Sequence, residues 1–313
     1  MRLVSRRLVV AALAAAALLA PAARAEDPGL PVVATFSILA DMTARVGGER
    51  IALTTLVGPN GDAHVYEPTP ADAKALAAAR VVVANGLGYE GWMTRLTKAS
   101  GTRATMVVAS TGVTPIAAHA DEDEHGHGRE KKGHDHGAVD PHAWQSVANA
   151  RAYVAVIRDG LIAADPAGRA TYEANAAAYV RELEALEAEV RAAVATVPEG
   201  RRRVITSHDA FGYFAAAYGI EFLAPQGVST EAEATAKSVA KLIRQIRREK
   251  ITAVFVENMT DRRLVDRIGR ETGVGLGGEL FADALSAKGG PAPTYVDMVR
   301  HNVKLLTQAM IGS

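Results

Sequence analysis

The feature that most constrains the fold is an alternation of short β-branched runs with alanine-rich helical segments. Strand-like runs occur at VVATFS (32–37), IALTTLV (51–57), VVVAN (81–85), ATMVVA (104–109), RVITS (203–207) and ITAVFVE (251–257). Amphipathic helical patterns lie between them, for example at 71–79 and 235–250. Strands that alternate with helices predict mainly parallel sheets covered on both faces. The expected fold is therefore α/β, with two similar lobes.

A longer helical pattern separates the two halves. Apolar or small residues recur at steps of four and three in one stripe, at Tyr172, Ala176, Tyr179, Leu183, Leu186 and Val190. The segment 174–195 contains no glycine or proline, and Pro198-Glu199-Gly200 follows it. One interpretation is an ordinary surface helix. Its position favours a linker helix of about 25 residues, nearly 40 Å long at ~1.5 Å per residue, which would limit hinge motion between lobes.

The first residues are typical of a cleaved export signal. Arg2, Arg6 and Arg7 precede an apolar run from Leu8 to Ala20, and an A-x-A pattern ends at Ala25. The apolar run is too short to span a bilayer. We therefore expect four segments: a signal peptide at 1–25, a first lobe at 26–165, the linker helix at 166–198 and a second lobe at 199–313.

Charge and cysteine content narrow the function. The chain has 35 basic and 35 acidic side chains, and the predicted signal removes four arginines and no acid. The slightly acidic remainder argues against a nucleic-acid partner, which needs a clustered basic face. There is no cysteine, so a metal site must use histidine and carboxylates, and no lipid can be attached through an N-terminal cysteine. We expect a soluble, monomeric periplasmic protein without a lipid anchor.

Three histidines follow predicted strands or lie in the loops beyond them. His64 lies in GPNGDAHVYEPTP, His142 in VDPHAW and His208 in ITSHDAFGYF. Each alone could be a hydrogen-bonding loop residue. Loops beyond the carboxyl ends of strands are, however, where open α/β sheets bind ligands. Neutral imidazoles suit a borderline-soft divalent ion when thiolates are absent. His301, in the last helical segment, is expected on a helix surface.

A tetrahedral site needs a fourth ligand. The candidates are Asp283 in ELFADALS and Glu257 at the end of ITAVFVE. Carboxylates that do not bind the metal could instead accept the second N–H of an imidazole, a role open to Glu67, Asp140 or Glu257.

The segment HADEDEHGHGREKKGHDHG (119–137) contains five of the nine histidines. Its composition cannot build a core and predicts a flexible His- and acid-rich loop spanning 117–138. We expect His119, His125, His127, His134 and His136 to bind zinc weakly and to pass it inward or sense it. The alternative is a plain solvated loop.

Four motifs, GDAHVYEPTP, DPHAW, TSHDAFGYFAAAYG and FVEN, resemble those of the zinc- and manganese-binding substrate-binding proteins of ABC importers. This resemblance covers the whole chain after the signal. It implies two α/β lobes joined by a long rigid helix, with one metal at their interface. The metal ligands it implies are His64, His142, His208 and Asp283. Asp283 departs from the family pattern, because Ala284 stands where proline is usual.

The resemblance also bears on the metal and the partner. Manganese-binding members tend to have glutamate at the third ligand position, whereas this chain has His208, so Zn²⁺ is expected and Mn²⁺ is the alternative. The implied function is capture of zinc and delivery to the membrane permease of an importer, with a periplasmic zinc chaperone as a further possible partner. Other interpretations are a zinc buffer or metallochaperone, or a zinc hydrolase. Four protein ligands would close the water position that hydrolysis needs, so no enzyme is expected.

Overall fold

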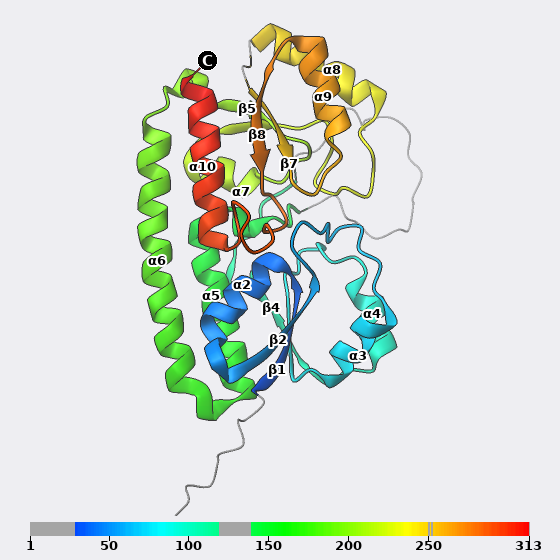
Figure 1. Cartoon of the computed structure of the whole chain (residues 1–313), viewed down its shortest axis with the longest axis vertical. Coiled ribbons are helices and arrows are strands. Elements are labelled where there is room, and N and C mark those ends of the chain that lie inside the picture. The colour runs from blue at the N-terminus through cyan, green and yellow to red at the C-terminus, as the bar shows by residue number, and fades with distance from the viewer. Residues whose placement is uncertain (1–28, 119–138, 250, 252, 313) are drawn as a thin grey trace, which may run out of the picture.

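The computed structural model describes residues 29–118, 139–249, 251 and 253–312. Its two lobes lie one above the other in Figure 1, each built on a four-stranded sheet. Every strand pairing in both sheets is parallel. The expected α/β fold of two similar lobes is therefore confirmed. The predicted segment boundaries at 25, 165 and 198 stay predictions.

The first sheet has the order β2-β1-β3-β4 and the second has the order β6-β5-β7-β8, so the two lobes share one topology. The strands of the first sheet are β1 (Leu30–Phe36), β2 (Ile51–Val57), β3 (Val81–Ala84) and β4 (Thr105–Val108). Those of the second are β5 (Arg203–Ile205), β6 (Glu221–Leu223), β7 (Ala253–Glu257) and β8 (Gly275–Leu280).

Helices cover both faces of each sheet. In the first lobe they are α2 (Ser37–Gly47), α3 (Pro70–Ala78), α4 (Met93–Ser100) and α5 (Val147–Ala164). In the second lobe they are α7 (Gly212–Tyr218), α8 (Ala236–Glu249), α9 (Arg262–Thr272) and α10 (Tyr295–Ile311). In the first sheet α2 and α5 lie on one face and α3 on the other, and in the second α10 lies opposite α8 and α9 (Figure 1).

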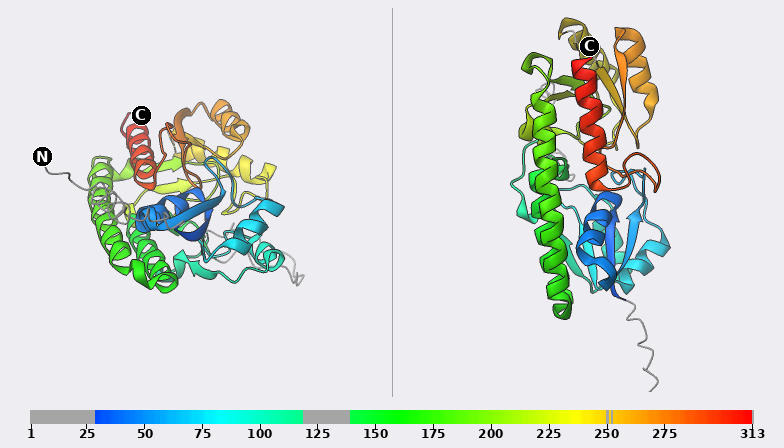
Figure 2. Two further views of the ribbon diagram at one scale, coloured as in Figure 1. Left: turned by 60° about the horizontal axis from the view of Figure 1, so that its bottom comes forward. Right: turned by 60° about the vertical axis from the view of Figure 1, so that its left-hand side comes forward.

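The linker helix is α6 (Arg169–Ala195), and it runs alongside both lobes (Figures 1 and 2). It packs against α2 and α5 of the first lobe and against α10 of the second. All six residues of the stripe predicted from the sequence are buried in this contact. The expectation of one long helix joining the lobes is therefore confirmed, and its continuous packing makes a wide hinge motion unfavourable.

One large apolar core includes buried residues of both lobes and of α6, while a smaller one lies between the second sheet and the α8–α9 layer. β7 contributes to both, because Phe255 enters the large core and Val254 the small one. Alternate residues of a strand point to opposite faces, so the second sheet separates the two cores. No described helix is long and apolar enough to cross a membrane.

Candidate metal centre

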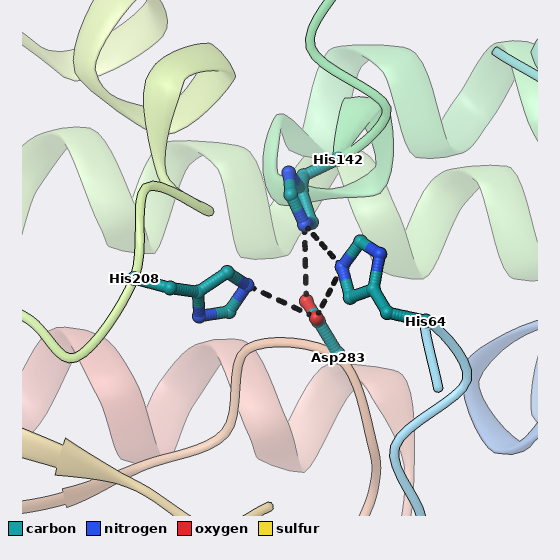
Figure 3. A group of neighbouring side chains, drawn as sticks. All are labelled: His64, His142, His208 and Asp283. Atoms are coloured by element: carbon teal, nitrogen blue, oxygen red, sulfur yellow. Dashed lines mark hydrogen bonds and ion pairs between the residues drawn. The ribbon is translucent and has the colours of Figure 1, made fainter. Parts of the chain in front are cut away.

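Four side chains meet where the two lobes face each other: His64, His142, His208 and Asp283 (Figure 3). All four are buried, and one ligand atom from each lies within 4.8 Å of the others. The four residues expected to form the site are therefore the ones that the fold brings together. In the described part of the chain, this is the only group of three or more histidine and carboxylate side chains that could hold a metal ion.

The ligand segments come from loops at the facing ends of the two sheets. His64 lies between β2 and α3, and His208 follows β5. Asp283 follows β8, while His142 comes just before the short helical turn that leads into α5. Because parallel strands end at the same edge of a sheet, loops distant in sequence converge there.

The separations of the donor atoms suit a small tetrahedral ion. Asp283 Oδ2 lies 3.1 Å from His208 Nε2 and 3.2 Å from His64 Nε2. His142 Nε2 lies 3.6 Å from Asp283 Oδ1 and 3.3 Å from His64 Nε2. A tetrahedron with metal–nitrogen bonds of ~2.0–2.1 Å has edges of about 3.3 Å. A single ion could thus contact all four side chains with small shifts of the rings.

Asp140 holds the ring of His142 from the side away from the site. Its Oδ1 accepts the backbone N–H of His142 at 2.9 Å and lies 2.8 Å from His142 Nδ1. Asp140 and His142 are both buried. With Nδ1 donating to this carboxylate, Nε2 is left to face the other ligands as a metal-binding lone pair.

Glu257 does the same for His208 from the end of β7. Its Oε1 accepts the backbone N–H groups of Ser207 and His208 at 2.9 and 3.0 Å, and its Oε2 contacts His208 Nδ1. Both side chains are fully buried. Glu257 therefore orients His208 and lies behind the ring, so the fourth position belongs to Asp283 rather than to Glu257.

His64 is held differently. Its backbone N–H donates to Asp62 Oδ1 at 2.9 Å, and the edge of its ring faces Tyr89, with centroids 4.6 Å apart. Among the described residues, no carboxylate bonds its Nδ1. The sequence analysis did not single out Asp62. The signal was present as a repeated Asp-x-His pattern, at Asp62-Ala63-His64 and Asp140-Pro141-His142.

The charges in the site favour a cation. Burial alone raises the pKa of Asp283, but His142 and His208 outweigh it and hold that pKa well below its usual range. Burial lowers the pKa of His142, yet Asp283 and Asp140 raise it to about 9. Burial lowers the pKa of His64, despite Asp283 nearby. A divalent ion could replace the protons that now balance Asp283.

Hydrogen bonding points the same way. Among the described residues, His208 Nε2 and both carboxylate oxygens of Asp283 are buried and form no hydrogen bond of good geometry, and the polar atoms facing them belong to the site itself. Buried polar atoms are normally hydrogen-bonded, and exceptions need an explanation. The four side chains point toward one another in Figure 3, with one ligand atom of each within 4.8 Å of the others, and a shared ion would account for this arrangement.

Contacts from the first lobe fix the loop that carries Asp283. The backbone oxygen of Ala282 accepts hydrogen bonds from Trp144 Nε1 at 2.9 Å and from Gln145 Nε2 at 2.7 Å. On the other side, the backbone N–H of Leu285 donates to Ser37 Oγ at 2.9 Å. Asp283 therefore follows a strand of the second lobe, but its loop is anchored to the first.

The remaining predicted residues lie elsewhere. Glu67 is exposed and lines an outer cavity beside Trp92, away from the four ligands. His301 lies in α10, partly exposed, with Nε2 2.9 Å from the backbone oxygen of Glu279. The predicted loop histidines, His119, His125, His127, His134 and His136, lie outside the described residues.

Known proteins with this fold share its full length. The family model of the zinc-uptake complex component A, periplasmic, matches residues 32–309. The chain is 35% identical to the manganese-binding lipoprotein MntA of Halalkalibacterium halodurans over 92% of this chain and 93% of that one. It is 34% identical to the iron ABC transporter substrate-binding lipoprotein MtsA of Streptococcus pyogenes serotype M1, over 91% and 90%.

A solved structure is also similar to this chain over most of its length. The periplasmic zinc-binding protein TroA of Treponema pallidum superposes with a TM-score of 0.80 and 30% identity, covering 90% of this chain and 99% of that one. The fold and the buried His₃Asp group thus define the metal-binding component of an ABC importer, an extracytoplasmic substrate-binding protein and not an enzyme. The chain belongs to the family of the zinc-uptake complex component A.

Proposed function

We propose that this protein captures Zn²⁺ in the periplasm and delivers it to the membrane permease of a zinc importer. The single observation that carries the proposal is the donor set, in which His64, His142, His208 and Asp283 supply three imidazole nitrogens and one carboxylate. Zinc prefers four ligands in a tetrahedron and accepts nitrogen readily, whereas manganese prefers more oxygen atoms. MntA and MtsA bind manganese and iron by their names, so the metal must be decided on this chain's own residues.

Glu257 supports histidine as the donor at the third position. A glutamate in place of His208 would direct a carboxylate toward a site where Glu257 is already fully buried. Two buried carboxylates without a proton or cation between them repel each other strongly. The imidazole avoids this because its Nδ1–H donates to Glu257 while Nε2 faces the metal. The surroundings of position 208 therefore suit a nitrogen ligand.

Competitive titration with Zn²⁺ and Mn²⁺ tests the choice of metal. The wild type should bind zinc more tightly by at least about 100-fold, as nitrogen-rich sites do along the divalent series. The double variant His208→Glu/Glu257→Gln gives the metal a second carboxylate ligand and removes the negative charge of Glu257 next to it. In this variant the ratio of zinc affinity to manganese affinity should fall at least about tenfold. Equal affinities in the wild type, or an unchanged ratio in the double variant, would contradict zinc selectivity by this donor set.

Delivery to an importer is tested separately from affinity. Deletion of the gene should abolish growth at limiting zinc. Expression of the wild-type protein should restore growth, and expression of His208→Ala should not. A periplasmic zinc buffer without an importer would instead leave uptake of labelled zinc unchanged. The absence of cysteine supports a protein that is not lipid-anchored, unlike the lipoproteins MntA and MtsA.

We also propose that the His-rich loop at 117–138 is auxiliary. The four buried donors form a complete tetrahedral set without it. Deletion of residues 119–137 should therefore leave the tightest zinc site within about twofold of wild-type affinity and remove only weaker binding. Loss of the tight site on deletion would place a ligand in the loop.

A further inference from the structure

Asp62 connects a metal ligand to the opposite lobe. Its Oδ1 accepts the backbone N–H of His64 at 2.9 Å, and its Oδ2 accepts the hydroxyl of Thr230 at 2.7 Å. His64 belongs to the first lobe, whereas Thr230 lies between β6 and α8 of the second. One carboxylate thus bonds at once to the backbone of a ligand and to the other side of the interface.

Comparison with Asp140 shows what is unusual about Asp62. In both Asp-x-His turns, the Oδ1 atom accepts the backbone N–H two residues later at 2.9 Å. Asp140 Oδ1 also lies 2.8 Å from the ring Nδ1 of His142, so its contacts to this ligand stay within one lobe. Asp62 instead uses its second oxygen across the interface. The backbone of His64 is therefore tied to the opposite lobe through a single carboxylate.

The loop that carries Thr230 is itself fixed near another ligand. Gln226 Nε2 donates to the backbone oxygens of Thr230 at 3.3 Å and Ala232 at 2.7 Å, which holds the loop in shape. Gln226 also pairs by its backbone with His208. A chain of contacts therefore runs from the backbone of His208 through Gln226, Thr230 and Asp62 to His64.

Two cavities are lined by the contact or by the neighbours of Thr230 in the chain. One, of about 220 Å³, is lined by His64 and Tyr89 from the first lobe and by Ser229 and Glu231 from the second. Of the four ligands, only His64 lines it. The other, of about 360 Å³, is lined by Asp62 and Thr230 themselves.

We propose that Asp62 and Thr230 are positioning residues that set how long the metal stays bound, by locking His64 in place when the lobes are closed. The proposal rests on metal binding by His64, His142, His208 and Asp283. A bond to a charged acceptor is worth more than a neutral one, and its loss frees His64 to leave the metal. The contact between Asp62 and Thr230 thus affects the rate at which the metal dissociates more than the assembly of the four ligands.

The test is the rate at which a chelator removes the metal from the full-length protein, measured by stopped flow for Zn²⁺ and separately for Mn²⁺. Thr230→Val, which keeps the size of the side chain, should raise the dissociation rate about five- to tenfold. Thr230→Ser should restore the rate to within about twofold. Ser229→Ala is the matched control, because Ser229 Oγ accepts a bond from the backbone N–H of Glu231 within the same loop and bonds no other described residue. The dissociation rate of this variant should stay within about twofold of the wild type.

A double-mutant cycle identifies the partner. In the Asp62→Ala background, Thr230→Val should have no further effect, because the contact is already lost. The thermal unfolding temperature of the metal-free Thr230→Val protein should fall by no more than about 5 °C, as expected for the loss of one hydrogen bond, whereas a general structural role would lower it much further. An unchanged rate in Thr230→Val, additive effects in the cycle, or an equal effect of Ser229→Ala would each overturn the proposal.

The two metals separate this proposal from the proposed function. If the protein binds manganese more tightly than zinc, the proposed function in zinc capture is wrong. The role of Thr230 is then decided by comparing the rates at which manganese dissociates from Thr230→Val and from the wild type. If zinc is preferred and the variant rates equal the wild type, only the positioning role fails. A protein that retained neither ion would overturn both.

Discussion

At the scale of single residues, carboxylates behind the site hold the rings of two of its histidines and the backbone of the third. His142 has Asp140, His208 has Glu257, and the backbone of His64 has Asp62. Such contacts fix the tautomer and raise the basicity of the ring, so they tune affinity without adding a ligand. The cost of burying Asp140 and Glu257 is offset by the N–H groups that they accept.

Glu257→Gln should weaken zinc binding by about 10- to 100-fold, the usual range for loss of such a contact. The amide keeps the size of the side chain but removes the charge behind His208. Asp140→Asn should act similarly on His142, and competition titration with a chromophoric chelator measures both. Glu67→Gln is the control, because Glu67 is exposed and away from the ligands. Equal affinity in all three variants would contradict the roles of Asp140 and Glu257.

Zinc binding should release protons and strengthen as pH rises. Burial lowers the pKa of both rings, but the nearby carboxylates outweigh it: they raise the pKa of His142 to about 9 and that of His208 well above its usual value, so we expect both rings to carry a proton at pH 7 before metal binds. A metal ion binds only the neutral ring, so it must displace these protons. The apparent affinity should therefore rise from pH 6.5 to 9. Calorimetry in buffers of different ionisation enthalpy should give at least one proton released per zinc at pH 7, and a value of zero would contradict this.

The ligands were readable from the sequence because each histidine follows a recognisable element and stands in a family-like motif. The orienting carboxylates were only partly readable. Of the three candidates, Asp140 and Glu257 contact ring nitrogens of His142 and His208, whereas Glu67 lies elsewhere, and Asp62 was not a candidate. The contact of Glu257 with His208 depends on how β7 packs against the loop after β5, a separation of 50 residues that no local pattern encodes.

At the scale of elements, the strongly periodic segments were predicted correctly, whereas strand β8 and helix α5 were not predicted. Strand β8 reads GLGGEL, which has a weak strand pattern, yet a Cβ at Gly277 would lie 2.4 Å from the ring of Phe255. Helix α5 contains Gly160, where a Cβ would lie 2.3 Å from Val107 of β4. Glycine is required in both for close packing, and packing is invisible in the local sequence. Strand β6 was missed because it has only three residues.

The buried stripe of α6 should carry much of the stability of the interface between the lobes. Leu186→Ala removes a fully buried side chain and should lower the free energy of unfolding by about 2–5 kcal/mol. Arg181→Ala, at an exposed position of the same helix, should change it by less than about 0.5 kcal/mol. Urea unfolding of the metal-free proteins measures both, and equal stabilities would contradict the linker role of α6.

At the scale of the whole molecule, the ligands are divided between lobes less evenly than the strand positions suggest. Asp283 follows a second-lobe strand, but Trp144, Gln145 and Ser37 of the first lobe hold its loop. By position in the sequence alone, each lobe would supply two ligands. The contacts instead leave His208 as the ligand held mainly by the second lobe, through Glu257. Any separation of the lobes therefore acts on the bonds of the metal to His208 and, through Thr230, on His64.

Zinc should consequently stabilise the whole protein and not only its loops. Ligand segments from both lobes must stay together for the metal to stay bound, and a ligand that binds only the native state stabilises it by mass action. At free zinc 1,000-fold above the dissociation constant, the gain in unfolding free energy should be about 4 kcal/mol. Differential scanning calorimetry should show one cooperative transition moving upward with zinc, while His64→Ala, His208→Ala and Asp283→Ala each remove most of the shift. Two separate transitions, with only one moved by zinc, would show that the metal stabilises one lobe alone and that α6 does not couple them.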